Sequence, residues 1–265
     1  MKLEKKAKKF RQQAYLLTLL VRRNIKNQYY RSFIGVLWTV LNPLLNMLVM
    51  AFVFSQLFGT DTTLDYPLYI LSGNIIFNIM RTSTSGSLPC LVQQRDMLQK
   101  TRVSIALFPT ANVLSSLVTF GFSFIALLIV ALVRFAVGEY TFHWEIILTI
   151  VIVPAVSLFS LGISYFLSAL YVFFRDIEHI YSVLLTLWTY LTPLFYTVET
   201  LQSELVNKVM NFNPMYHYVE YFRALLEGTI PSGWEHLVCY AFAIAAFVIG
   251  YAFMRAVRNH IAANL

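Results

Sequence analysis

Long apolar runs with almost no charge dominate this chain of 265 residues and constrain its fold more than any other feature. A helix needs about 20 apolar residues to cross a bilayer core, whereas a membrane β-strand needs about ten. Only 12% of the residues are charged, against roughly 25% in a soluble domain. We therefore expect an all-α polytopic membrane protein with six transmembrane helices, at 34–58, 67–88, 103–133, 146–174, 180–198 and 237–257.

The basic residues predict the orientation of these spans. Ten of the 20 Lys and Arg residues precede the first apolar run. With the N-terminus inside, seventeen of the 20 fall on the cytoplasmic side and three on the outer side, which is the asymmetry expected of membrane proteins. We therefore expect both termini in the cytoplasm. The net charge of +7 then marks a membrane face, and we expect no nucleic-acid partner.

The segments between the spans predict one transmembrane domain over residues 1–265. It would consist of a basic arm at 1–33, five spans within 34–198, an outer segment at 199–236, and the sixth span with a tail at 237–265. The five histidines show no ligand spacing, so we expect no metal site. Cys90 and Cys239 fall at opposite ends of the span map, which argues against a bridge between them.

Residues 14–33 repeat apolar side chains every four positions, with basic residues on the other side. This pattern predicts an amphipathic helix lying in the membrane interface. One interpretation is a basic anchor that only fixes orientation; the other is a movable element at the cytoplasmic mouth. Its basic side carries Arg22, Arg23, Lys26 and Arg31.

The loop at 89–109 contains a short charged stretch for which we expect a helix over about 91–102. Considered alone, it is either a solvated loop or a surface helix that docks into a groove of a partner. Its central residues are Gln94, Arg95, Asp96, Met97, Leu98, Gln99 and Lys100.

The segment 199–236 predicts two short helices. Asn213 and Pro214 are typical of an N-cap and a first helical position, and Gly228 of a C-terminal stop. The enclosed helix is too short to cross a bilayer, and a helical stretch at about 200–210 precedes it. Glu220 and Arg223 can pair along one face. The two helices form either a re-entrant hairpin or a hairpin on the membrane surface.

The chain lacks the residues that would supply energy or catalysis. No glycine precedes a lysine, so the phosphate-binding signature of nucleotide hydrolases is missing. The one close acidic pair, Asp176 and Glu178, lies at an expected span boundary, and no carboxylate falls mid-span as in proton-driven transporters. We therefore expect a transport subunit that is not an enzyme and that takes its energy from another chain.

Four blocks along the chain resemble one family, the membrane subunits of type-2 ABC exporters in the branch that exports lipid-linked polysaccharides. The blocks are YYRSFIGVLW at 29–38 with Asn42-Pro43, LQK at 98–100 through Phe108-Pro109, FFRDI at 173–177, and TPLFY at 192–196 followed by Asn213-Pro214 and Arg223.

The resemblance implies a homodimer of this subunit with two copies of a cytoplasmic ATPase, in the bacterial inner membrane. ATP and magnesium would belong to the ATPase, and this chain would hold no cofactor. The cargo would be O-antigen, capsule or teichoic acid on a lipid carrier. The amphipathic helix would be a cytoplasmic gate whose basic side chains contact the lipid pyrophosphate, and 94–100 would be the coupling helix. Asn213, Pro214, Glu220 and Arg223 would belong to an outer gate.

Aromatic side chains are candidates for the path of a glycan, since sugars stack on aromatic rings and hydrogen-bond to hydroxyls. The alternative for each is an interfacial aromatic belt or ordinary helix packing. The candidates on the second, fourth and fifth spans are Tyr69, Phe77, Tyr171, Phe174, Trp188, Tyr190 and Tyr196.

Two alternative functions follow from the same residues. A type-2 exporter could carry another cargo, such as a drug, a lipid or a peptide. A different class would be a membrane-embedded transferase or a passive channel that works without an ATPase. The missing acid pair and metal ligands argue against a transferase, and the charged helix at 94–100 argues against a channel.

Overall fold

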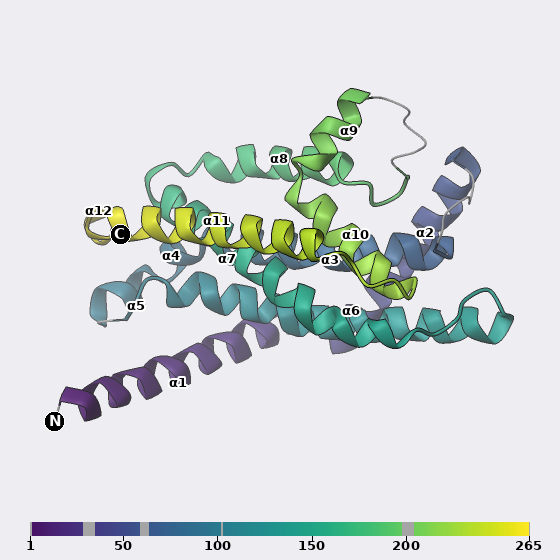
Figure 1. Cartoon of the computed structure of the whole chain (residues 1–265). Helices are drawn as coiled ribbons and strands as arrows, with labels where there is room; N and C mark the ends of the chain where they lie inside the picture. Colours follow the sequence, from purple (N-terminus) through teal and green to yellow (C-terminus); the bar gives the residue numbers. More distant parts are fainter. Residues whose placement is uncertain (1, 29–34, 59–63, 102, 198–203, 265) are drawn as a thin grey trace.

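The computed structural model describes residues 2–28, 35–58, 64–101, 103–197 and 204–264, and every regular element in these ranges is helical. The expected all-α fold is confirmed for them. Most helices follow one long axis (Figure 1). The elements are α1 (Lys2–Gln28), η1 (Gly35–Leu37), α2 (Trp38–Phe58), α3 (Tyr66–Ser87), α4 (Cys90–Gln93), α5 (Arg95–Lys100), α6 (Leu107–Val137), η2 (Trp144–Leu148), α7 (Thr149–Phe173), α8 (Ile177–Leu191), α9 (Glu204–Asn211), α10 (Pro214–Leu226), α11 (Gly233–Ala256) and α12 (Arg258–Asn264).

Three helical segments of the described chain are long and apolar enough to cross a membrane: Leu107–Val137, Trp144–Phe173 and Gly233–Ala256. They correspond to the third, fourth and sixth expected spans. Helices α2 and α3 have 21 and 22 residues, at the positions of the first and second. We refer to the end of the bundle that carries α9 as the α9 end and to the opposite one, with α4, α5 and α12, as the α12 end (Figure 1).

Helix α3 forms the centre of the bundle although its sequence is the most polar of the expected spans. Leu68, Ile76 and Met80 are completely buried. Several of its hydroxyl groups bond to the carbonyls of the preceding turn, as Ser83 does to Ile79 at 2.6 Å and Thr84 to Met80 at 2.6 Å. Because these hydroxyls are satisfied within the helix, they can be buried without a large desolvation cost, whereas the buried Ser87 hydroxyl has no hydrogen-bond partner among the described residues.

Helices α7 and α11 cross at a point where only glycine fits. A Cβ on Gly162 would overlap the backbone of Ala246, and a Cβ on Gly250 would overlap the carbonyl of Gly162. Ala246 and Gly250 lie four residues apart, the spacing of small residues that lets membrane helices approach closely. The two backbones therefore pack in direct contact.

Two helices differ in length from the sequence expectation. Helix α1 begins at Lys2 rather than at residue 14, because the Lys, Gln and Ala residues before the apolar repeat favour helix on their own. Helix α8 has 15 residues and ends at Leu191, whereas a span over 180–198 was expected. Pro193 explains this end, since a proline disfavours helical geometry in the residue before it.

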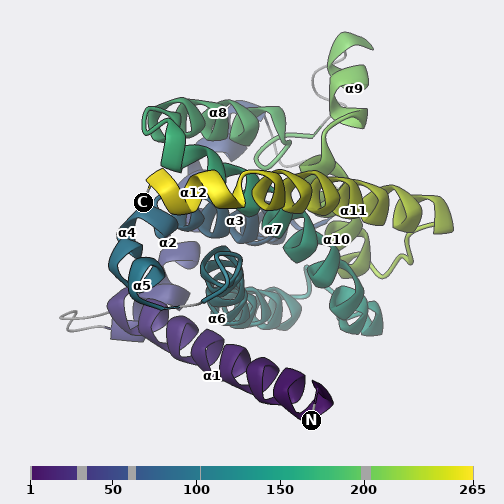
Figure 2. The same ribbon diagram turned by 90° about the vertical axis from the view of Figure 1, so that its left-hand side faces the viewer.

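A second core closes the α12 end. Leu20 of α1 packs with Leu91 of α4, Phe108 of α6 and Met254 of α11 in one buried cluster. Viewed along the bundle, α1 lies beside α6 while α8 lies on the opposite side (Figure 2). Helix α1 is therefore part of the fold as well as an amphipathic surface element.

Candidate functional site

A cavity of about 660 Å³, here called the central cavity, lies between α2, α3, α6 and α8. Its polar lining residues are Gln28, Thr39, Asn42, Asn46, Asn74, Asn78, Arg81, Thr82, Ser116, Thr119, Ser123, Thr186 and Thr189, and the others are Trp38, Pro43, Met50, Ile75, Ile79, Phe120, Tyr190 and Phe195.

Helical spacing brings the polar residues together. On α3, Asn74, Asn78 and Arg81 lie at i, i+4 and i+7, which is one face of a helix, and they are half-buried where most of the helix is fully buried. Asn42 and Asn46 have the i, i+4 spacing on α2. The side-chain amide of Asn46 donates to the side-chain oxygen (Oδ1) of Asn42 at 3.3 Å. Polar faces of apolar helices that meet at one cavity are typical of a water-filled path.

Arg81 supplies the positive charge of the central cavity. Its Nη2 donates to the hydroxyl of Thr189 on α8 at 2.6 Å, and its guanidinium carbon lies 5.3 Å from the centroid of the Phe77 ring. Arg81 lies within α3, inside the expected second span, and lines the cavity. No Asp or Glu belongs to the lining as far as the structure describes it. Amide and hydroxyl groups therefore dominate the described lining, in which Arg81 is the one cation.

One of the seven candidate path aromatics lines the central cavity. Tyr190 does so and is 64% exposed. Tyr69 and Phe77 are buried at 6% and 1%, in the core around α3. In this conformation these two rings therefore pack in the hydrophobic core and do not line the central cavity.

The other four aromatics lie outside the central cavity lining. Phe174 is 66% exposed, between α7 and α8. The Tyr171 hydroxyl donates to Glu178 at 3.0 Å, the Trp188 indole N–H donates to Asn213, and the Tyr196 hydroxyl donates to the Tyr190 carbonyl. Their polar atoms thus have intramolecular partners.

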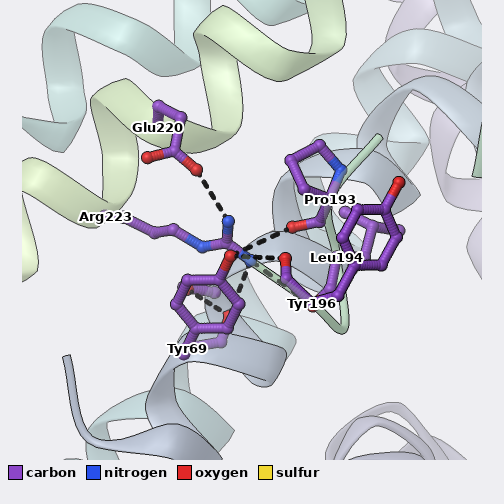
Figure 3. Close-up of polar contacts among 7 residues, drawn as sticks. Tyr69, Pro193, Leu194, Tyr196, Glu220 and Arg223 are labelled. Atoms are coloured by element: carbon purple, nitrogen blue, oxygen red, sulfur yellow. Dashed lines mark hydrogen bonds and ion pairs between the residues drawn. The ribbon is translucent and has the colours of Figure 1, made fainter. Parts of the chain in front are cut away.

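Arg223 of α10 forms the best-connected polar site of the α9 end (Figure 3). It is 1% exposed, and its Nη1 donates to Glu220 at 2.8 Å. Its Nη2 donates to the backbone carbonyls of Tyr69 on α3 at 3.2 Å and of Leu194 after α8 at 3.4 Å. Its guanidinium carbon lies 3.4 Å from the centroid of the Tyr69 ring. The pairing of Glu220 with Arg223 was expected from their spacing, whereas the contacts with Tyr69 and Leu194 were not.

Tyrosine hydroxyls attach the segment 192–196 to α3. The Tyr69 hydroxyl donates to the Tyr196 carbonyl at 2.8 Å, and the Tyr66 hydroxyl donates to the Phe195 carbonyl at 3.0 Å. Just before α3, Arg134 of α6 binds Asp65 with an Nη2–Oδ1 distance of 2.7 Å. Burial raises the pKa of the Asp65 carboxyl even though Arg134 opposes the shift.

Asn213 caps α10 as its sequence predicted. Its side-chain oxygen accepts from the Met215 N–H at 3.1 Å, and Pro214 takes the first position of the helix. The same oxygen accepts from the Trp188 indole at 2.8 Å, and the amide nitrogen donates to Thr192 at 3.0 Å. At the other end Gly228 has φ of 79°, which favours glycine. Asn213 thus connects α10 to α8.

The seven residues of the charged stretch 94–100 differ in their exposure, which bears on its docking to a partner. The expected helix over about 91–102 is divided into α4 and α5 at Gln94. Arg95, Asp96, Gln99 and Lys100 are exposed on one face of α5, while Met97 and Leu98 are half-buried against the second core. The Arg23 guanidinium of α1 donates to the Gln94 side chain at 2.9 Å. The exposed charged face, rather than Met97 and Leu98, is available to a partner.

The four basic residues expected on the amphipathic helix differ in what the structure shows of them. Arg22 and Lys26 are exposed, Arg23 contacts Gln94, and Arg31 lies outside the described residues. Asn24 of α1 donates to Asn112 of α6 at 2.8 Å. Helix α1 is therefore attached to both α6 and the segment before α5.

Comparison with known proteins decides the family, because residues 15–226 match the ABC-2 type transporter family. The chain belongs to this family. The O-antigen export system permease protein RfbA of Myxococcus xanthus is 34% identical over 211 residues, 79% of each chain. The protein of the same name from Klebsiella pneumoniae is 25% identical over 237 residues, 89% of each chain. The polysialic acid transport protein KpsM of Escherichia coli is 19% identical over 249 residues, 93% of this chain and 95% of that protein.

The family assignment made from the four sequence blocks is thereby confirmed, and this ABC-2 chain is a transport subunit. Sequence reasoning missed the central cavity itself. Its signal was present as pairs of asparagines four residues apart, at Asn42 with Asn46 and at Asn74 with Asn78. Only the structure shows that both pairs line one cavity.

Proposed function

We propose that this chain is the transmembrane subunit of an ATP-driven exporter of a lipid-linked polysaccharide, such as O-antigen, capsule or teichoic acid. Export would run from the cytoplasmic to the outer side of the bacterial inner membrane. Membership of the ABC-2 family and relatives named for O-antigen export and polysialic acid transport support the proposal. The observation that carries it is the lining of the central cavity, which is rich in amides and hydroxyls and has no carboxylate among the residues that the structure describes.

The chemistry of the central cavity fits a hydrated glycan. Each sugar hydroxyl can donate and accept hydrogen bonds, and Asn and Thr side chains do the same. Weak, exchangeable bonds distributed along a path let a chain advance, because no single site holds it tightly. Arg81 offers one strong donor that suits an acidic sugar or a phosphate. Tyr190 and Trp38 provide rings at the wall of the same cavity.

The proposed topology has six spans with both termini in the cytoplasm. Helices α2, α3 and α8 would join the three long apolar helices as spans, and the α12 end would face the cytoplasm. Helices α9 and α10 would form a re-entrant hairpin of eight and 13 residues in the outer leaflet. Arg223 and Asn213 support this hairpin as an outer gate, since they attach α10 to α3 and α8.

A second copy of the chain would complete the path. Beside the central cavity, α2 exposes Leu48 and Phe52 at 59% and 73%, and α8 exposes Val183 and Leu187 at 61% and 54%. Two copies facing each other across these helices would enclose a wider passage than one subunit provides. Two copies of a cytoplasmic ATPase, with ATP and magnesium, would supply the energy.

Helices α1 and α5 would transmit movement at the cytoplasmic side. The exposed face of α5 would sit in the ATPase as the coupling helix, with Arg95 and Asp96 central to it. Helix α1 would act as the gate helix, and Arg22 and Lys26 would be available for the pyrophosphate of the lipid carrier. The bond between Arg23 and Gln94 supports a mechanical connection between the two helices.

Reconstitution with the partner ATPase tests the proposal. Proteoliposomes containing both proteins should move a fluorescently labelled lipid-linked glycan across the bilayer when ATP is supplied. The variant Asn74→Leu/Asn78→Leu should lower this transport at least tenfold, because each leucine removes an amide from the central cavity. Asn259→Leu, at an exposed position of α12, is the matched control and should transport like the wild type.

Three outcomes would contradict the proposal. Normal glycan transport by the asparagine double variant would show that the central cavity is not the path. Transport of a small dye or a peptide with no response to the glycan-lipid would assign another cargo to this ABC-2 subunit. Transport without any ATPase would favour a channel or a transferase instead.

A further inference from the structure

A second cavity, of about 610 Å³, lies at the α12 end and is here called the arginine cavity. It is separate from the central cavity, with which it shares no lining residue. Three parts of the chain form it: α1, the segment before α6, and the junction of α11 with α12. The lining consists of Gln13, Val103, Ser104, Ile105, Ala106, Tyr251, Met254, Arg255 and Arg258.

The junction of α11 with α12 supplies the cationic wall of the arginine cavity. Tyr251, Met254 and Arg255 lie in the last turns of α11, which ends at Ala256, and Arg258 is the first residue of α12. Both arginines are exposed, and neither forms a hydrogen bond or an ion pair with another residue in the described part of the chain. Among the described residues, the lining contains no Asp or Glu. Two guanidinium groups thus line one space without a counter-charge in the described part of its wall.

The remaining walls combine apolar surface with uncharged donors. Val103, Ile105 and Ala106 form the apolar part, and Ser104 and Gln13 contribute a hydroxyl and an amide. The Tyr251 ring is packed in place against Phe247, with ring centroids 5.9 Å apart and nearly parallel. A ligand of this cavity therefore needs both an anionic group and apolar chains.

We propose that the arginine cavity binds the phosphate-bearing headgroup of a lipid. Paired arginines bind phosphate oxygens through strong, charge-assisted hydrogen bonds. Basic pockets between membrane helices, at the end where a span meets the interface, are typical places for anionic headgroups. Arg255 lies in the last turn of α11, the long apolar helix that ends there. The apolar walls then receive the first part of the acyl or prenyl chains.

The phosphate can come from two sources. One is an anionic phospholipid of the surrounding leaflet, which requires only that the chain is in a membrane. The other is the pyrophosphate of the lipid carrier, and that source rests on the function proposed above. Lipid binding measured without transport separates the two proposals, because a failure of glycan export leaves phospholipid binding unchanged.

Native mass spectrometry of the full-length chain in detergent micelles tests the arginine cavity. The probes are phosphatidylglycerol, neutral phosphatidylcholine and a polyprenyl pyrophosphate, each titrated separately. We expect the wild type to retain phosphatidylglycerol in preference to phosphatidylcholine. Arg255→Gln and Arg258→Gln should each weaken this binding about threefold, and the double variant about tenfold. Arg255→Lys/Arg258→Lys should recover part of it, because the charges remain.

Arg175→Gln is the matched control, since it removes one exposed charge between α7 and α8, at the same end of the bundle. It should bind phosphatidylglycerol like the wild type. Equal binding by the wild type and the double glutamine variant would overturn the proposal, as would a loss of equal size in the control. Retention of the polyprenyl pyrophosphate alone, with the same dependence on both arginines, would support the phosphate site and assign the lipid carrier as its source.

Discussion

The two ends of the bundle place arginine in opposite surroundings. At the α9 end, Arg223 is 1% exposed and its guanidinium contacts a carboxylate, two backbone carbonyls and an aromatic ring. At the α12 end, Arg255 and Arg258 remain exposed beside a cavity. A buried cation with many partners holds its neighbours in one arrangement, whereas exposed cations remain available to ligands. The comparison indicates a rigid α9 end and an adaptable α12 end.

Arg223→Ala, at the rigid α9 end, is the substitution for which we expect the largest loss of stability. It should lower the free energy of unfolding by about 3 kcal/mol, because it removes a buried donor to the carbonyls of Tyr69 and Leu194 and opens a space beside Tyr69. Chemical unfolding in detergent micelles, followed by circular dichroism, measures the loss. Arg255→Ala, at the exposed end, should change stability by less than about 0.5 kcal/mol. Equal losses from the two variants would end the distinction between a rigid and an adaptable end.

Asn213→Ala should have the next largest effect, a loss of about 2 kcal/mol in the same unfolding measurement. The substitution removes the cap of α10 and the acceptor of the Trp188 indole. Asn211→Ala is the control, because this exposed asparagine lies two residues earlier, in α9. A control as destabilised as the test variant would show that α10 does not depend on its cap.

Gly73→Ala tests how closely Arg223 is held against α3. A Cβ at this position would lie 2.8 Å from Nη2 of Arg223 and 3.2 Å from the Leu194 side chain. The variant should therefore lose about 1 kcal/mol through overpacking. Gly121→Ala in α6 meets no atom within 4 Å and should be neutral or slightly more stable, since alanine favours helix. A neutral Gly73→Ala variant would mean that the guanidinium can move aside easily.

Arg95→Ala/Asp96→Ala should have the smallest effect on stability and a large one on transport. Both side chains are exposed, so the free energy of unfolding should change by less than about 0.5 kcal/mol. If α5 couples the ATPase to this subunit, glycan transport per ATP hydrolysed should fall at least tenfold in proteoliposomes. Leu98 is kept intact because it packs against the second core. An unchanged ratio of glycan transport to ATP hydrolysis would contradict the proposal that α5 contacts the ATPase.

The sequence predicts local features of this chain well because their causes are local. The cap at Asn213-Pro214, the stop at Gly228 and the pairing of Glu220 with Arg223 each depend on residues within one or two turns. Apolar length likewise identified the three long helices. These features need no knowledge of how the helices face one another.

Contacts between residues far apart in the chain could not be predicted from the sequence in the same way. Arg223 donates to a carbonyl of Tyr69, 154 positions away, and no spacing rule connects them. The central cavity depends on which face each of four helices turns inward, and hydropathy alone does not encode that choice. The aromatic candidates show the consequence: Tyr69 and Tyr190 are the same residue type, yet one is buried and the other lines the central cavity.

The glycine crossing between α7 and α11 determines which helices can move. Because Gly162 and Gly250 leave no gap between the two backbones, neither helix can slide past the other without separating from it. The pair should therefore pivot as one body during a transport cycle. Helix α8 buries Tyr181 and Leu185 and is attached to its neighbours by side-chain hydrogen bonds, such as Arg81 with Thr189 and Trp188 with Asn213, so it is packed less closely than this pair.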